Sequence, residues 1–159
     1  MTTATKETLH AGPVEIRFLI DGDDSGGSLT MFECLVPASV QVPAPHSHDA
    51  FEETIYGLTG VSTWTIDGRV HDVHPGEAVC IPRGAVHGFA NGGDAATTFL
   101  AVATPGVFGP AYFREVGAVL AAAQGGPPDL AALGEVMRRH GLTPAVPAAG
   151  GPVTSPMDG

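Results

Sequence analysis

Short runs of alternating hydrophobic and polar residues fill the chain up to about residue 104, and turn residues separate them. Side chains two positions apart on a strand face the same side, so this alternation is typical of strands with one buried face. Asp67-Gly68, between two such runs, is the signature of a two-residue hairpin turn. The predicted strands cover residues 14–20, 29–35, 53–56, 62–66, 78–81, 87–90 and 97–103. Because no helical segment lies between them, they predict an antiparallel sandwich or barrel rather than alternating strands and helices.

Beyond residue 105 the hydrophobic period becomes that of a helix. Pro110 suits the first position of a helix, where its missing N–H costs nothing. Phe113, Val116 and Leu120 then share one helical face, until the glycine pair at 125–126 ends the helix.

A second helix follows. Asp129 suits its N-cap, and Leu130, Leu133 and Met137 form an apolar stripe that we expect to pack against the barrel. The arginines at 138–139 suit its C-terminal end, where the helix dipole is negative.

The composition favours one folded domain with tails. The chain has 159 residues, of which 22 are Gly and 14 are Pro, an excess over the ~12% of typical proteins. Disorder does not follow, because 43% of the residues are hydrophobic and can form a core. We expect an all-β fold with two C-terminal helices, divided into an N-terminal tail (1–13), a barrel (14–104), a helical extension (105–143) and a flexible tail (144–159).

The net charge of −10 argues against nucleic-acid and anionic-membrane partners, because those surfaces bind clustered cations. A small-molecule partner is therefore expected. Lys6 is the only lysine and lies in a polar N-terminal stretch, which argues against Schiff-base chemistry.

With no long apolar stretch and no signal-peptide pattern, the sequence predicts a cytoplasmic protein. Cys34 and Cys80 each lie in an apolar run and are expected to be reduced core thiols.

Histidines and an acid cluster in Pro45-His46-Ser47-His48-Asp49-Ala50-Phe51-Glu52-Glu53. On an extended chain His46 and His48 face the same side and can point at one cation. Glu53 has the opposite parity, so it joins them only if residues 49–51 form a turn or bulge. By itself this pattern is a weak indication of a metal site.

A second stretch strengthens the case. Residues 76–91 contain a turn glycine, a strand, a Pro-x-Gly turn and a second strand that carries His87 near its start. Two hairpins of one barrel would then supply three imidazoles and one carboxylate, enough to hold a divalent first-row metal with positions left open.

The two stretches resemble the two motifs of the cupin superfamily, G-x5-H-x-H-x3-4-E-x6-G and G-x5-P-x-G-x2-H-x3-N. The matching positions are His46, His48, Glu53 and Gly60 in the first, and Gly76, Pro82, Gly84, His87 and Asn91 in the second. Only the leading glycine of the first motif differs, where this chain has Val40. The C-terminal helices also resemble those of bacterial one-domain cupins described as quercetin-dioxygenase-like.

The resemblance implies a single jelly-roll barrel in which His46, His48, Glu53 and His87 bind one divalent transition metal, whether Fe, Ni, Mn, Co or Zn. Glu53 is also the predicted catalytic residue, as a ligand that accepts a proton. Four apolar residues are candidates for the substrate pocket, although each could equally belong to the core: Ile55, Trp64, Phe89 and Phe99. Alternation puts Glu52 on the solvent side, and His71 and His74 are expected on the surface.

Three functions remain open. The leading prediction is a dioxygenase resembling quercetinases, acting on a small apolar or phenolic compound. The alternatives are a redox-neutral isomerase, lyase or cyclase that uses a Lewis-acid metal, and a barrel that binds a small molecule without catalysis. Family resemblance also predicts a homodimer, for which the β-rich segment 14–20 outside the motifs gives modest direct support.

Overall fold

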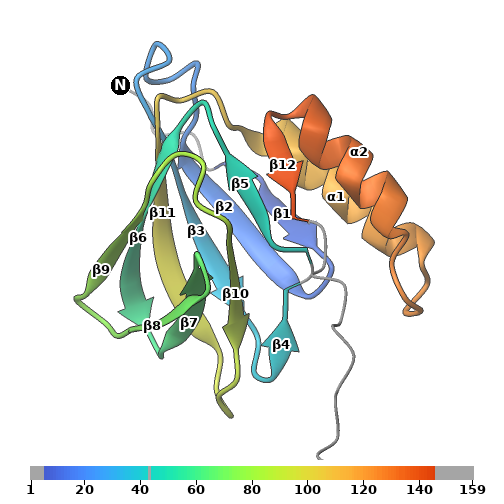
Figure 1. Ribbon diagram of the computed structural model, residues 1–159, viewed down its shortest axis with the longest axis horizontal. Helices are drawn as coiled ribbons and strands as arrows, with labels where there is room; N and C mark the ends of the chain where they lie inside the picture. The colour runs from blue at the N-terminus through green and yellow to red at the C-terminus, as the bar shows by residue number, and fades with distance from the viewer. Residues whose placement is uncertain (1–5, 43, 146–159) are drawn as a thin grey trace, which may run out of the picture.

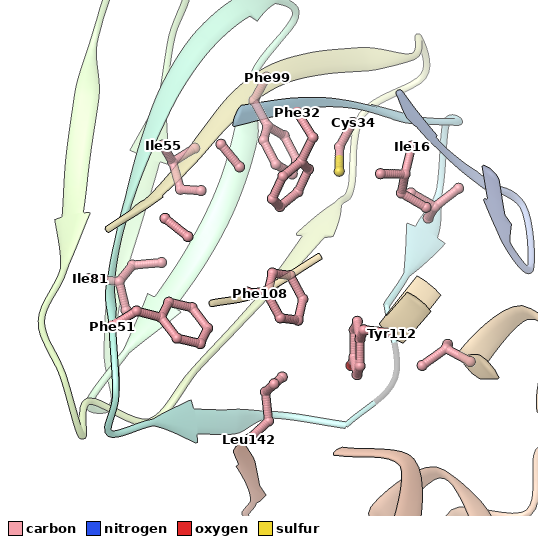
Figure 2. Packing of buried hydrophobic residues seen from close by; sticks show 14 of the residues in the cluster. Ile16, Phe32, Cys34, Phe51, Ile55, Ile81, Phe99, Phe108, Tyr112 and Leu142 are labelled. Carbon is pink, nitrogen blue, oxygen red and sulfur yellow. The ribbon is translucent and has the colours of Figure 1, made fainter. Parts of the chain in front are cut away.

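The strands bury every second side chain between two sheets, as the hydrophobic pattern predicts. A computed structural model describes residues 6–42 and 44–145. In β2 (Val14–Ile20) and β11 (Thr97–Thr104) buried positions alternate with more exposed ones along the strand. The buried side chains of the two sheets meet in one hydrophobic core, in which Ile16, Ile55 and Phe99 are at most 1% exposed. Figure 2 shows these side chains converging on a common interior.

Two antiparallel sheets form the barrel. The first has the strand order β1-β2-β3-β11-β6-β9, and the second has the order β12-β5-β10-β7-β8 with β4 also paired to β10. The remaining strands of the first sheet are β1 (Thr8–Ala11), β3 (Thr30–Val36), β6 (Glu52–Thr59) and β9 (Ala78–Ile81). The second sheet contains β4 (Val40–Gln41), β5 (His46–His48), β7 (Ser62–Ile66), β8 (Arg69–Val73), β10 (His87–Asn91) and β12 (Leu142–Pro144). Because the chain passes repeatedly from one sheet to the other, the fold is the jelly roll expected from the sequence.

All seven predicted strands are present, with boundaries that differ by at most a few residues. The structure adds a strand in the predicted N-terminal tail and another where the predicted helical extension meets the C-terminal tail. Thr8–Ala11 is a strand paired with β2, and Leu142–Pro144 is a strand paired with β5. The barrel therefore extends beyond the predicted range 14–104 at both ends. Residues 1–5 and 146–159 of the predicted tails lie outside the described residues.

Both predicted helices are present, α1 (Pro110–Ala122) and α2 (Leu130–Arg139). Pro110 lies in the first turn of α1, and the Asp129 carboxylate caps α2 by accepting a hydrogen bond from the Ala132 N–H at 3.0 Å. One residue of the predicted stripe is misplaced. Leu130 is 62% exposed, because it is the first residue of α2 and lies outside the buried face that Leu133 and Met137 share.

The helical pair closes one open flank of the barrel. β1 and β12 are the end strands of the two sheets on that flank. α1 packs against β1, α2 packs against β12, and the two helices pack against each other. Figure 1 shows the pair running beside β1, β5 and β12.

Two other details of the sequence prediction change. Cys34 is buried as expected, but Cys80 is exposed because it lies on the outward face of the edge strand β9. The segment 14–20 is β2, an internal strand between β1 and β3, so it offers no free edge for pairing between subunits. No helix in the described part of the chain is long and apolar enough to cross a membrane.

Candidate metal centre and its cavity

A bend between β5 and β6 brings His48 and Glu53 to the same side of the chain. His48 is the last residue of β5, residues 49–50 bend, and Glu53 is the second residue of β6. The bend lets Glu53 face the same side as His48 despite its opposite parity, as the sequence analysis required. The His48 carbonyl accepts a hydrogen bond from the Gly84 N–H at 2.9 Å, which ties this bend to the turn before β10.

The Pro-x-Gly turn delivers His87 to the same place. Gly84 has a φ of 78°, a conformation that favours glycine, and the Ala85 N–H donates to the Pro82 carbonyl at 3.2 Å. His87 follows as the first residue of β10 and lies opposite His46 in the antiparallel pairing of β10 with β5.

Three of the four predicted ligands form one compact cluster. Oε2 of Glu53 lies 3.5 Å from Nε2 of His48 and 3.7 Å from Nε2 of His87. One ligand atom from each of these residues lies within 4.8 Å of the others, and no other such group occurs among the described residues. The His46 ring is adjacent, 4.6 Å from the His87 ring centroid, but its nitrogens fall outside this cluster.

All three imidazoles are held in the same tautomer. Their Nδ1 atoms face backbone carbonyls, that of His48 at 2.8 Å from Phe51, that of His87 at 3.0 Å from Ala85 and that of His46 at 3.2 Å from Ala44. A carbonyl can only accept, so Nδ1 carries the hydrogen and Nε2 keeps its lone pair. Such a hydrogen bond on the far nitrogen is what metal-ligating histidines usually make.

The donor set fits a divalent metal. Nε2 of His48 is buried and has no hydrogen-bond partner among the described residues, an arrangement that is costly unless something binds the lone pair. Burial also lowers the pKa of His46 to about 4 and lowers the pKa of His87, which favours the neutral form that binds metals. Imidazoles with one carboxylate suit first-row metals such as zinc or iron.

The cluster lines a cavity of about 330 Å³. All four predicted ligands line it, and most of its other walls are aromatic or aliphatic. Aromatic rings gather next to the cluster: Trp64, Phe89 and Phe99 are in mutual contact, with ring centroids 4.7–5.2 Å apart. The His48 ring stacks on Phe51 at 4.0 Å.

Three of the four residues predicted for the substrate pocket line this cavity. Trp64, Phe89 and Phe99 line the cavity, whereas Ile55 does not. Ile55 is fully buried in the core, because β6 places it deeper between the sheets than Glu53.

The cavity has a wall that the sequence did not predict. Phe108, Tyr112 and Phe113 line it from the segment after β11, and further side chains come from both helices. Tyr112 is 7% exposed, and burial together with the nearby Glu53 charge raises the pKa of its phenol, which therefore stays protonated. The apolar stripe on α1 was the available signal, but a stripe alone does not distinguish packing from cavity lining.

Residues predicted to lie outside the site do so. Glu52 has a side chain that is 41% exposed and pairs with Arg83 at 2.5 Å. His71 and His74 are both exposed.

Comparisons with known proteins agree with this architecture. Residues 31–103 match the cupin domain family. Among solved structures, the polyketide cyclase RemF from Streptomyces resistomycificus is 36% identical, with a TM-score of 0.52, over 58% of this chain and 65% of that one. A sugar phosphate isomerase of the cupin superfamily from Silicibacter pomeroyi is 25% identical, with a TM-score of 0.51, over 58% of this chain and 59% of that one. The chain thus covers less than two thirds of either relative.

A more distant match supports the fold alone. A predicted oxalate decarboxylase from Thermotoga maritima is 21% identical, with a TM-score of 0.59, over 66% of this chain and 99% of that one. A search of curated proteins found no significant match.

Proposed function

Residues 31–103 are a cupin domain, and from this premise we propose that the chain is a metal-dependent enzyme that cyclises an extended, polyketide-like aromatic compound without net oxidation. The observation that carries the proposal is the cluster of His48, Glu53 and His87 in the lining of an aromatic-walled cavity. The 36% identity to a polyketide cyclase supports this reaction class above the others.

His48, Glu53 and His87 would hold the metal, with His46 as the adjacent fourth ligand. A divalent metal held there would act as a Lewis acid toward a substrate carbonyl and so acidify the neighbouring C–H bond.

Glu53 is the proton acceptor in this proposal. Its side chain is 12% exposed, and its carboxylate borders the cavity. It takes a proton from a carbon between two carbonyls, that carbon forms a bond to a carbonyl carbon further along the chain, and the new alkoxide is reprotonated. Loss of water then makes the ring aromatic. Atoms and electrons balance without an oxidant.

The aromatic walls hold the folded chain of the substrate and exclude water. Trp64 and Phe99 are at most 2% exposed and line the cavity, so the substrate would meet an apolar, aromatic wall there. A dry, shaped cavity favours one ring closure over competing condensations.

A dioxygenase, the leading prediction from sequence, is the second candidate, and one observation favours it. Two histidines and one carboxylate are the donor set typical of non-haem iron oxygenases, and these are the three side chains in the cluster. None of the three relatives described above is an oxygenase by name.

Metal content and oxygen consumption test both candidates. Protein purified without chelators should contain about one zinc or similar metal per chain, and a poly-β-ketone analogue should cyclise under nitrogen. Cyclisation that requires oxygen, or oxygen uptake with flavonols or catechols, would favour the dioxygenase instead.

Replacing His46 and His48 together by Ala should remove the metal while the β-sheet circular dichroism persists. Full metal retention in that double variant would overturn the site.

A further inference from the structure

The cavity continues from the His/Glu cluster into the space between the barrel and the helical pair. Its lining includes Val116 and Leu120 of α1, and Leu133 and Met137 of α2. Leu142 of β12 completes this outer part. In Figure 2, Tyr112 and Leu142 lie between the core of the barrel and the helices.

The helical side chains of this outer part belong to the hydrophobic core and also line the cavity. Leu133 and Met137 are only 2–3% exposed, yet both line the cavity. Val136, on the same helix and equally buried, does not line it. Of the three buried side chains of α2 that are larger than glycine, two therefore line the cavity and one packs away from it.

Polarity divides the cavity in two. The charged and imidazole side chains of its lining all belong to the ligand group on β5, β6 and β10. The helices and β12 contribute no charged side chain to the lining. A ligand that fills both parts therefore needs a polar, metal-binding end and an apolar end.

We propose that the α1–α2 pair is the specificity wall of the site, which selects substrates with two or three fused or folded rings by enclosing the rings furthest from the metal. This rests on the proposed function, because it assumes that the polar end of the ligand lies at the cluster. The volume of about 330 Å³ falls within the ~300–1,000 Å³ of pockets that hold drug-sized ligands, so a single-ring compound leaves the outer part empty.

A series of diols of increasing length tests the wall. Catechol, 2,3-dihydroxynaphthalene and alizarin share a vicinal diol that binds metals and have one, two and three rings. Their affinities are measured by calorimetry on the full chain loaded with one equivalent of Zn²⁺, which is redox-silent. We expect the dissociation constant to fall at least tenfold from catechol to alizarin.

Substitutions on α2 test whether the tighter binding of the longer diols depends on the helices. Met137→Trp fills the outer part and should weaken alizarin binding at least tenfold, while the affinity for catechol changes less than threefold. Leu130→Trp, on the exposed side of the same helix, should leave both affinities unchanged. If Met137→Trp does not fold, Leu120→Trp on α1 makes the same test, because Leu120 lines the cavity and is only partly buried.

The outcomes separate this inference from the proposed function. If catechol binds but alizarin binds no more tightly, or if Met137→Trp weakens both ligands equally, the helices are not a specificity wall and the metal site stands. If none of the diols binds the zinc-loaded protein, the proposed site fails and the inference fails with it.

Discussion

Glu52 and Glu53 are adjacent in sequence but lie in opposite environments. The Glu53 carboxylate lies near two imidazole nitrogens inside the barrel, whereas Glu52 is on the surface and pairs with Arg83. Glu53→Gln should lower zinc affinity at least tenfold, because a neutral amide oxygen is a weaker ligand than a carboxylate. Competition with a chromophoric chelator measures this. Glu52→Gln is the matched control and should stay within twofold of the unchanged protein; equal losses in both variants would refute the assignment of Glu53.

Asn91 stabilises the barrel without being placed at the metal. Its side chain is 1% exposed, and its Nδ2 donates to the carbonyls of Val36, Pro37 and Ala95 at 2.8–3.0 Å. Its Oδ1 accepts from the Gly93 N–H at 3.0 Å.

Asn91→Ala should therefore lower the free energy of unfolding by about 1–3 kcal/mol, because buried backbone groups lose their partners. Urea denaturation measures the loss, and zinc stoichiometry should stay the same. A variant of unchanged stability that loses zinc would show that Asn91 acts on the site instead.

Sequence reasoning succeeded for residues whose environment follows from local parity and turns. It predicted the bend between His48 and Glu53, because the chain had to bend for both side chains to face one cation. Its prediction that Cys80 is buried was wrong, because a short apolar run does not show which of its residues face outward. Ile55 is buried in the core and does not line the cavity. His46, the fourth predicted ligand, lies beside the cluster, and its role as a ligand stays a prediction.

At the scale of elements, contact between α1 and β1 depends on a glycine. A Cβ at Gly117 would lie 2.3 Å from the His10 carbonyl oxygen, a distance that forces the helix away from the strand. Gly117→Ala should lower stability by about 1–3 kcal/mol even though alanine favours helices by about 1 kcal/mol. Thermal or urea unfolding measures the change.

Gly134→Ala on α2 is the matched control. The nearest atoms to a Cβ there are 3.5–3.7 Å away, on the flexible Arg138 side chain and on Pro144, which is ordinary contact. This variant should gain about 0.5–1 kcal/mol from helix propensity. If both variants gain stability, the packing of α1 on β1 is looser than the structure indicates.

Elements with a strong period were predictable, and short edge strands were not. β1 and β12 have four and three residues, and β12 contains Pro144, so neither has enough alternation to be recognised. Their pairing is decided by neighbours far away in the chain. The role of the helices in the cavity was hidden for the same reason, since it depends on what α1 and α2 enclose.

The family-based homodimer remains a prediction at the scale of the whole molecule. Its support from the segment 14–20 is lost, because β2 is internal and α1 packs on the adjoining edge strand β1. Light scattering on the purified chain should give twice the mass of one chain. A monomer at all concentrations would contradict it.

The proposed metal site joins the two sheets of the barrel. His48 and His87 belong to the second sheet, and Glu53 belongs to the first, so an ion held by all three bridges the layers. Because the unfolded chain lacks this arrangement, metal binding should stabilise the whole barrel. At a free zinc concentration of 100 times the dissociation constant, the gain is about 2.7 kcal/mol. For a chain of this size that corresponds to a rise of about 5–10 °C in the unfolding temperature.

Differential scanning calorimetry after chelator treatment and zinc titration measures this rise. The double variant His46→Ala, His48→Ala should show no rise, because Glu53 and His87 alone leave the second sheet with a single ligand. His71→Ala is the control for surface binding and should keep the full rise, since His71 is exposed on β8. A rise that persists in the double variant and disappears in His71→Ala would mean that zinc binds the surface and does not bridge the sheets.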